Sequence, residues 1–419
     1  MSDTAPPPKV LARLEETRTR REEYYRHLHA HPELSHQEHA TAASVAGRLR
    51  ASGLEVTEGV GGTGVVGVLT NGEGPRVLLR ADMDALPIRE ASGADHASTA
   101  TATTEDGTEV PVAHACGHDV HVTCLLEAAD LLAGERAAWS GTLIALFQPA
   151  EELGDGARTM VADGLADLVG PVDVAMAQHV LALPAGTVAT REGPVLAAAD
   201  SVRITVHGRG SHGSMPQTSV DPVVLAAMIV LRLQTIVSRE IDPTDPAVVT
   251  VGSLHAGSKS NVISDRAVLE VNTRTYSEAT RAGLLASIER IVRAECTASG
   301  SPREPEFEYY DRFPVTVNDP GVTATVRAAF ETHFGDAAGE LALQSASEDF
   351  SDVPDALDAP YTYWGIGGTD PEQYARAEAA GRLDRDIPVN HSPAFAPVVR
   401  PTLEVGTRAL VVAALAHLA

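Results

Sequence analysis

Six side chains that can bind a divalent metal ion lie in four short segments of this 419-residue chain. They are Cys116 and His118 in HACGHD, Glu151 and Glu152 in QPAEE, His179 in AQHV, and His391 in VNHSP. Thiolate, imidazole and carboxylate groups are ligands of zinc and similar ions. We expect each of these segments to lie at a junction between a strand and a loop. Taken singly, His179 and His391 favour a core or loop histidine, but the whole set predicts a metal site.

The two adjacent glutamates follow the apolar run ALFQPA. A bare carboxylate is too costly to bury, so Glu151 and Glu152 must be solvated, paired or bound to metal. Two adjacent carboxylates can also have different roles in catalysis. One can bind a metal ion while the other accepts a proton from water, whose pKa the metal lowers to about 7.

Two other motifs have simpler alternatives. Asp82 and Asp84 in RADMDALP either cap a turn at a strand end or orient metal ligands from behind. Gly59, Gly61 and Gly64 match the spacing of a dinucleotide-binding loop, but the VVGVL that follows is typical of a strand where that motif requires a helix. The glycines therefore do not indicate a dinucleotide-binding site.

The elements around these motifs alternate between helix and strand. Helical patterns cover residues 11–29, 38–52 and 121–132, and apolar strands end at Glu151–Glu152 and at His179. Residues 92–112 lack a clear period and are expected to form a long loop. Strands that alternate with helices predict an α/β sheet with the site at the strand ends.

The pattern changes near residue 193. A strand, a helix over 221–237, two strands and a helix over 279–297 follow in the order βαββα, which predicts a small insert with an antiparallel sheet. We therefore expect three parts: residues 1–194 and 307–419 form one domain, and residues 195–306 form a second. The α/β pattern resumes with a helix over 323–334 and closes with a helix from 399 to the end.

Composition excludes several classes of protein. Hydrophobic residues make up 44%, which is enough for a buried core. The net charge of -25 disfavours nucleic acid and anionic membranes as partners. Three scattered cysteines fit a reducing compartment. The N-terminus lacks an apolar leader and Arg232 interrupts the best apolar stretch, 223–237, so we expect no signal peptide, no membrane span and a cytoplasmic protein.

Together the motifs HPELS, RADMDALP, HACGHDVH, QPAEE, GRGSHGSMP, NVISD, NTRTY, SEDF and VNHSP resemble, in this order, the M20 metallopeptidase superfamily. The similarity runs from about residue 11 to the end. The most similar subgroup is its amidohydrolases, which cleave N-acyl amino acids, hippurate and auxin conjugates. The resemblance implies an α/β catalytic domain with a mixed sheet flanked by helices, interrupted by a smaller α+β, ferredoxin-like lid and dimerisation domain.

The resemblance also implies roles for individual residues. Cys116, His118, Glu152, His179 and His391 would bind two divalent metal ions, which could be zinc, manganese, cobalt or nickel. Glu151 would be the general base. His212 of the insert would reach a neighbouring subunit's site and stabilise the oxyanion, with an exposed turn histidine as the alternative. Asn261 and Arg274 would hold the substrate's α-carboxylate, since arginine pairs with carboxylates through two hydrogen bonds; a surface salt bridge is the alternative for Arg274.

Departures from the family pattern refine the expected substrate. Peptidase and aminoacylase branches carry His-x-Asp where this chain has Asp82-x-Asp84, which favours the amidohydrolase subgroup. Gln217 stands where histidine is common, and His36 where an aromatic residue is usual. We expect a small-molecule substrate and a homodimer or homotetramer formed through the insert. A dipeptidase or exopeptidase and a non-catalytic ligand-binding relative remain the alternatives.

Overall fold

The computed structural model describes residues 9–418 and divides the chain into two compact units. The first unit comprises the described residues up to Val195, Val317–Leu343 and the residues from Asp349 onward. The second comprises Leu196–Thr316 and Gln344–Glu348. The expectation that the N-terminus carries no signal peptide concerns a segment of which residues 1–8 lie outside the described part of the chain.

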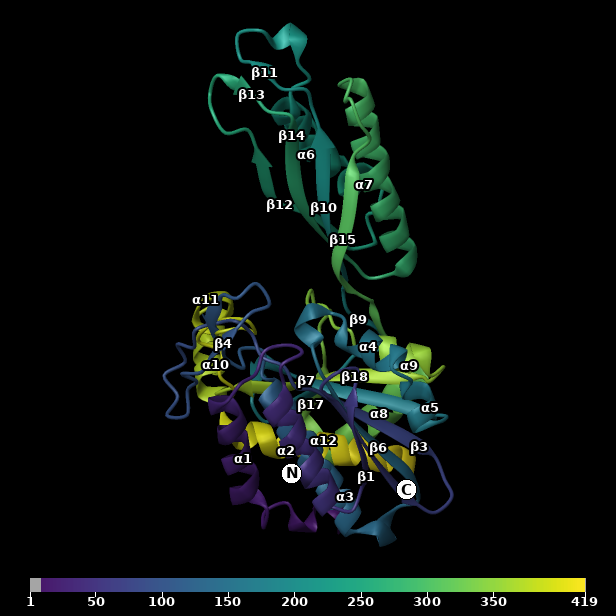
Figure 1. Cartoon of the computed structure of the whole chain (residues 1–419). Coiled ribbons are helices and arrows are strands. Elements are labelled where there is room, and N and C mark those ends of the chain that lie inside the picture. The colour runs from purple at the N-terminus through teal and green to yellow at the C-terminus, as the bar shows by residue number, and fades with distance from the viewer. Residues whose placement is uncertain (1–8, 419) are drawn as a thin grey trace. The chain divides into compact units, whose positions relative to one another are not determined.

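The first unit is built on an eight-stranded mixed sheet with strand order β1-β2-β6-β3-β7-β18-β8-β17 (Figure 1). Its strands are β1 (Glu55–Val60), β2 (Gly64–Asn71), β3 (Arg76–Asp82), β6 (Gly141–Gln148), β7 (Val174–Pro184), β8 (Val188–Thr190), β17 (Ala338–Glu340) and β18 (Tyr361–Thr369). Strand β3 pairs in parallel with both β6 and β7, and β7 pairs in parallel with β18. The expected α/β fold with a mixed sheet is confirmed.

The first unit also contains ten α-helices among its described residues. The longer ones are α1 (Arg18–Ala30), α2 (His39–Ala51), α3 (His118–Gly134), α8 (Pro320–Phe334) and α12 (Val399–Leu418); the shorter ones are α4 (Gly156–Ala162), α5 (Leu165–Val169), α9 (Asp352–Ala356), α10 (Pro371–Ala379) and α11 (Leu383–Asp386). Side chains on alternate positions of the central strands are buried on both faces of the sheet. Leu79 and Phe147 belong to the main hydrophobic core, which also contains residues of α3 and α12. Their chain neighbours Leu78 and Leu146 are also fully buried but do not belong to that core. Burial on both faces explains why these strands are continuous apolar runs.

Three sequence predictions in this unit need correction. The region 11–29 is a short 3-10 helix, Lys9–Arg13, followed by turns and then α1. The expected loop 92–112 contains a hairpin of β4 (Thr101–Thr103) and β5 (Glu109–Pro111). Strand β7 does not end at His179 but continues to Pro184, because its pairing with β18 runs that far. As predicted, VVGVL after these glycines is a strand: Gly59 lies in β1, Gly64 begins β2, and residues 61–63 form the turn between them.

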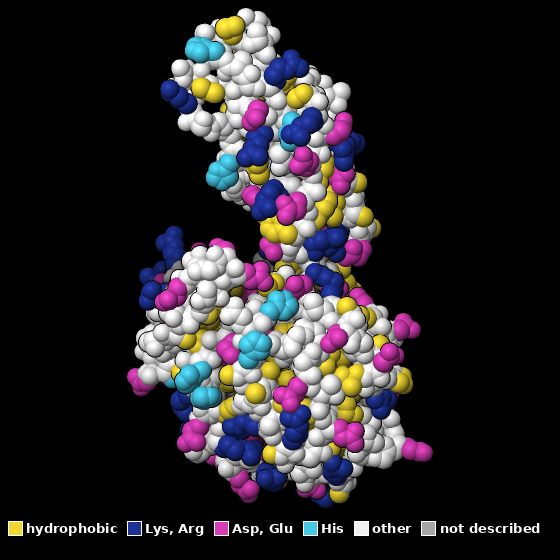
Figure 2. All heavy atoms as spheres, viewed as in Figure 1, with side chains coloured by type: hydrophobic (Ala, Val, Ile, Leu, Met, Phe, Trp, Pro, Cys, Tyr) yellow, Lys and Arg dark blue, Asp and Glu magenta, His cyan; other side chains and the backbone are white. Residues whose placement is uncertain are grey.

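The second unit has a four-stranded antiparallel sheet with order β12-β14-β10-β15 and two long helices. Its elements are β10 (Ala198–His207), β11 (Ser211–His212), α6 (Pro222–Arg239), β12 (Ala247–Ala256), β13 (Val262–Ile263), β14 (Arg266–Thr275), α7 (Glu278–Ala298) and β15 (Glu306–Phe313). Order in sequence and order in the sheet together match the ferredoxin-like arrangement. Figure 2 shows basic and acidic side chains intermixed over the visible side of this unit.

The second boundary of the insert differs from the expected one. The sequence pattern predicts that the insert ends at residue 306. In the structure, β15 pairs with β10 from Thr205↔Glu306 to Ala199↔Phe313, so β15 belongs to the insert. The unit therefore continues to Thr316. Two short strands, β9 (Gly193–Leu196) and β16 (Thr316–Asn318), pair with each other. An edge strand rich in charged residues, EFEYYDRF, carries too weak an apolar pattern to be assigned from sequence.

Helix α6 is 18 residues long with a mean hydropathy of 1.5, and 33% of it is buried. By length and composition it could cross a membrane, which differs from the sequence expectation that Arg232 rules this out. Its Leu225, Ile229 and Leu233 side chains are fully buried in the core of the second unit. The helix thus covers one face of the β12-β14-β10-β15 sheet.

Candidate metal centre

Three neighbouring strands bring the predicted ligands of the first unit together. Because β6, β3 and β7 run in parallel, their carboxyl ends lie at one edge of the sheet, where sites of open α/β sheets form. β3 ends at Asp82, and β6 is followed closely by Glu151. The last β3–β7 pair is Arg80↔Ala177, so His179, two residues later, lies level with Asp82 at the end of β3 although β7 itself continues.

Cys116, Glu152 and His391 form one group whose potential ligand atoms lie within 4.8 Å of one another. The Nε2 atom of His391 lies 3.3 Å from Glu152 Oε2. The backbone places His391 here, since its N–H donates to Ala115 O at 2.8 Å and its φ is 69°. Next to it, Asn390 Nδ2 donates to Cys116 O and Val180 O, both at 3.0 Å. Three segments distant in sequence are thereby joined.

His118 stands at the first position of α3, directly after Gly117 in the left-handed conformation. A Cβ at Gly117 would come within 2.4 Å of Val180, so this turn requires glycine. The His118 Nδ1–H donates to Asp84 O at 2.9 Å, with Asp84 Oδ1 at 3.2 Å. Its Nε2 therefore faces Glu151 Oε2 and Glu152 Oε1, each 3.9 Å away.

His179 is fixed in the same manner. Its Nδ1–H donates to Val180 O at 2.8 Å, and its Nε2 lies 3.5 Å from Cys116 Sγ. The five predicted ligands and Glu151 thus fall into overlapping groups at one edge of the sheet. Of the two sequence alternatives for Asp84, orientation of other site residues fits its contacts, because it also accepts hydrogen bonds from Ser35 Oγ at 2.7 Å and Glu152 N at 3.0 Å.

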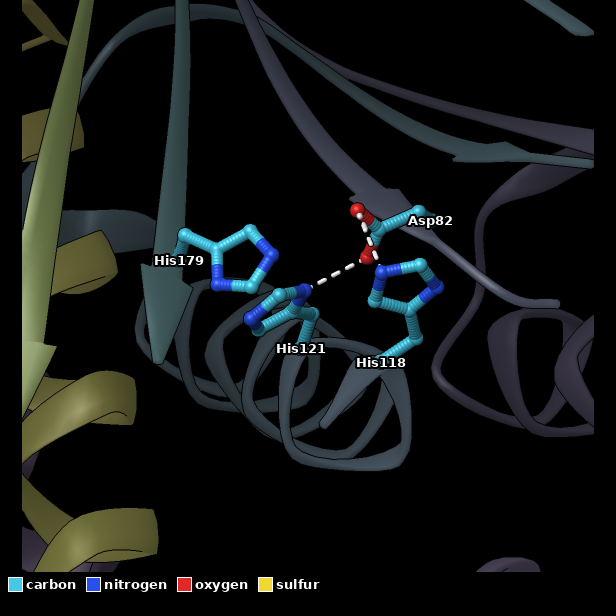
Figure 3. Close-up of side chains that lie close together, drawn as sticks. All are labelled: Asp82, His118, His121 and His179. Carbon is cyan, nitrogen blue, oxygen red and sulfur yellow. Dashed lines mark hydrogen bonds and ion pairs between the residues drawn. The ribbon is translucent and has the colours of Figure 1, made fainter. Parts of the chain in front are cut away.

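Asp82 and His121 also lie in the site, although the sequence does not assign either of them as a metal ligand. Figure 3 shows Asp82 between His118 and His121, with His179 beside them. Asp82 Oδ2 is 3.5 Å from His118 Nε2 and accepts from Arg80 at 2.8 Å. His121 was passed over although it lies in HACGHDVH. Both of its nitrogens are engaged: Nδ1 donates to Asp82 Oδ1 at 2.5 Å, and Nε2 accepts from Val180 N at 2.9 Å.

The electrostatics of the site depend on burial. Burial holds the pKa of His179 well below its usual range, so its imidazole is neutral, as a metal ligand must be. Burial and the Glu152 carboxylate raise the pKa of the Cys116 thiol. Hydrogen bonds to Cys116 and Glu152 raise the pKa of His391 to about 10. Burial opposes ionisation of Asp82, but His118, His121 and Arg80 hold its pKa well below the usual range.

Two buried polar atoms at this site show that its residues fit a bound cation. His118 Nε2 and Glu152 Oε1 are buried and have no hydrogen-bond partner, although orphaned buried polar atoms are rare in native proteins. Both atoms point among thiol, imidazole and carboxylate groups, which is the donor set of zinc-like ions. The arrangement can hold divalent metal with a further carboxylate, Glu151, beside it.

The structure does not bring the three predicted residues of the second unit together. His212 and Asn261 are neighbours, since β11 pairs with β13 and Gly213 N donates to Asn261 O at 2.8 Å. Arg274 lies near the other end of β14, whose length is roughly 30 Å at about 3.3 Å per residue. There Arg274 donates to Asn272 Oδ1 at 3.2 Å and to Ser347 Oγ. Within residues 9–418 it has no carboxylate partner, which disfavours the surface salt bridge.

Comparison with known proteins finds relatives over most of the chain. Residues 78–386 match Peptidase family M20/M25/M40. Thermostable carboxypeptidase 2 of Saccharolobus solfataricus is 40% identical over 306 residues, covering 72% of this chain and 75% of that protein. Hippurate hydrolase of Campylobacter jejuni is 37% identical over 329 residues, covering 77% and 82%.

A solved structure extends the likeness to the fold. It is described as a dinuclear metal binding peptidase from the M20 family of Bacillus subtilis, and it superposes with a TM-score of 0.76 at 27% identity, covering 96% of this chain and 98% of that one. The family resemblance, the donor set at the sheet edge and the flanking carboxylate agree with these matches. This chain belongs to peptidase family M20/M25/M40, and it is a hydrolase of that family.

Proposed function

We propose that this hydrolase cleaves the amide bond of N-acyl amino acids, releasing a carboxylic acid and a free amino acid. The observation that carries the proposal is the pair of orphaned atoms, His118 Nε2 and Glu152 Oε1, in a buried donor set beside the Glu151 carboxylate. A relative named hippurate hydrolase supports an acylated amino acid as substrate, because hippurate is one.

Cys116, His118, Glu152, His179 and His391 would hold two divalent metal ions. Bound metal supplies Lewis acidity, which polarises the amide carbonyl and lowers the pKa of water. Glu151 accepts the proton of the attacking water and delivers it to the departing amine nitrogen, so the amino acid leaves neutral at nitrogen. Asp84 and Val180 O keep the Nδ1 atoms of His118 and His179 protonated, so that each Nε2 stays free.

The second unit would supply substrate contacts. Arg274 would pair with the α-carboxylate of the amino acid, and its lack of an acidic partner supports this role. Asn261 would add a neutral hydrogen bond. His212 would stabilise the oxyanion of a neighbouring subunit's substrate. Its Nδ1 accepts from Ser214 N at 3.1 Å, so its proton lies on the exposed Nε2, available for donation.

We further propose a homodimer formed through the second unit. Val224, Met228 and Leu231 of α6 are 60%, 49% and 68% exposed, which is a large apolar stripe for one helix. A Leu231→Glu variant should shift the molar mass in light scattering from dimer to monomer, while Arg232→Glu on the same helix should not. A wild-type monomer would contradict the proposal.

A cytoplasmic location is also proposed. Cys116, Cys124 and Cys296 are all free and buried, which fits a reducing compartment. Cell fractionation of the full chain with its native N-terminus would test this location, and recovery outside the cytoplasm would contradict it.

The deciding experiment for the reaction is amino acid release from a substrate panel. The chain is stripped by chelator and refilled with zinc, manganese, cobalt or nickel, then offered N-acetyl and N-benzoyl amino acids and free dipeptides. We expect metal-restored release from the acylated substrates. Faster release from dipeptides would favour a peptidase, to which the relative named carboxypeptidase also points. A chain that binds metal but releases nothing from any substrate would contradict the proposal.

A further inference from the structure

One fully buried acid lies outside the set of proposed ligands and bases. Glu38 has an exposed fraction of 0% and stands at the N-terminus of α2, yet its side chain does not cap that helix. Glu33 performs that task instead, since its carboxylate accepts from Ala40 N at 2.9 Å and Thr41 N at 2.8 Å. The Glu38 carboxylate is therefore buried for some purpose other than the stability of α2.

The carboxylate of Glu38 reaches the loop that carries Glu151. Its Oε1 accepts a hydrogen bond from Ala150 N at 2.8 Å, and its Oε2 accepts one from Thr63 Oγ1 at 2.5 Å. Ala150 precedes Glu151 directly and is fully buried. The hydrogen bond therefore holds the Pro149–Ala150 peptide group, which lies one residue before Glu151.

The backbone at Ala150 is one that alanine rarely adopts. Its φ and ψ are 47° and 42°, in the left-handed region that favours glycine. A non-glycine residue remains there only when its surroundings enforce the conformation. After it the loop closes tightly, with Gly154 N donating to Glu151 O at 2.7 Å. The carboxyl oxygen of Glu38 provides the side-chain contact that holds this turn at its first residue.

The same short segment also reaches the other side of the site. Ser35, three residues before Glu38, donates to Asp84 Oδ2 at 2.7 Å, and Asp84 Oδ2 in turn accepts from Glu152 N. Leu34 forms a parallel bridge with Ala85, which keeps the segment in register with the chain after β3. The segment 34–38 therefore contacts both the loop that carries Glu151, here called the base loop, and the Asp84 carboxylate that orients His118.

We propose that Glu38 is a positioning residue that holds the Glu151 carboxylate in its working place through the Ala150 amide. This inference rests on the proposed role of Glu151 as general base. Loss of the contact lets the left-handed turn relax and moves Glu151 relative to the bound substrate. A displacement of about 1 Å can lower a rate on the order of 10²-fold. Glu38 contacts neither substrate nor ligand, so KM should stay close to its wild-type value.

The test compares Glu38→Ala with Glu33→Ala, a matched control in the same segment that removes a helix cap without touching the base loop. Hydrogen exchange of a peptide spanning residues 146–155 is measured on the metal-free chain, with kcat, KM and thermal midpoint measured on the metal-loaded chain. We expect faster exchange of this peptide in Glu38→Ala only. We also expect kcat to fall on the order of 10²-fold with KM within about twofold. Glu33→Ala should lower the thermal midpoint and leave kcat unchanged.

Two further variants keep the test decisive. Glu38→Gln retains an oxygen for Ala150 N and should recover most of kcat. If Glu38→Ala does not fold, Thr63→Val removes the hydroxyl that fixes the carboxylate and should produce the same changes to a smaller degree. Unchanged exchange of the 146–155 peptide, or a kcat loss that Glu33→Ala reproduces, would overturn the proposal. The exchange result stands even if wild type hydrolyses no substrate, so failure of the proposed reaction remains distinguishable.

Discussion

The predicted site residues of the two units are held in opposite ways. In the first unit they are mostly buried, and the Nδ1 atoms of His118 and His179 are each engaged by a backbone oxygen. In the second unit His212 is exposed, and its imidazole ring forms hydrogen bonds with the neighbouring Ser214. The first set is organised before anything binds, whereas the ring of the exposed His212 gains a defined environment only through a partner or substrate. Catalytic groups gain most from the former arrangement.

Glu151→Gln should produce the largest effect, because it removes a function that the buried set alone provides. The amide cannot accept a proton, so kcat should fall by about 10²–10⁴-fold. Elemental analysis should find the same metal content per chain as in wild type. Glu152→Gln is the matched control and should lose metal. Turnover that survives in Glu151→Gln would show that Glu151 is not the base.

His212→Ala tests whether the exposed set acts on another subunit. Removal of one oxyanion donor lowers kcat on the order of 10²–10³-fold. Because the side chain is exposed, the thermal midpoint should not change. Mixing this variant with Glu151→Gln and allowing subunits to exchange should restore part of the activity, since a mixed dimer contains one site with both groups intact. Absence of rescue after verified exchange would contradict donation between subunits.

Asp84→Asn sharpens the claim that the first set is organised in advance. Its carboxylate accepts from Ser35, Glu152 N and His118, and an amide would place N–H groups against some of these donors. Loss of such an orienting partner typically lowers metal affinity 10–100-fold. Competition with a chromophoric chelator measures this change. Asp106→Asn, in an exposed turn, is the control, and equal affinity in both variants would contradict the role of Asp84.

His29→Gln should have the smallest effect, on stability alone. His29 is buried between Asp119 at 2.6 Å and Glu90 at 3.0 Å. Burial opposes its charge, but these two acids raise its pKa from 6.5 to about 10. Its stabilising contribution is therefore complete below pH 6.5 and is lost as the pH rises through 10.

Urea unfolding of wild type and His29→Gln measures this pH dependence. At pH 6 the free energy of unfolding should be lower in the variant by about 1.5–3 kcal/mol, as for a hydrogen bond to a charged group. The difference should shrink as the pH approaches 10. A difference that is constant or grows with pH would contradict a charged His29.

Much of the fold and site could be predicted because the signals are local. The apolar runs around Leu79 and Phe147 indicate buried strands, and the polar residues that follow them indicate a site at the strand ends. His121 was missed because nothing in its spacing distinguishes a ligand from a residue that holds another side chain. β15 was assigned to the wrong domain because its pairing partner, β10, lies about a hundred residues earlier in the chain.

The chemical types at the site and the elements that carry them follow from the sequence, since these depend on residue identity and short-range periodicity. Which groups meet depends on how the chain packs in three dimensions. This packing placed Asp82 between His118 and His121, aimed Glu38 at Ala150 instead of its own helix, and separated Arg274 from His212 by the length of a strand. Such pairings depend on packing between segments distant in sequence, and no local pattern encodes the direction of a side chain.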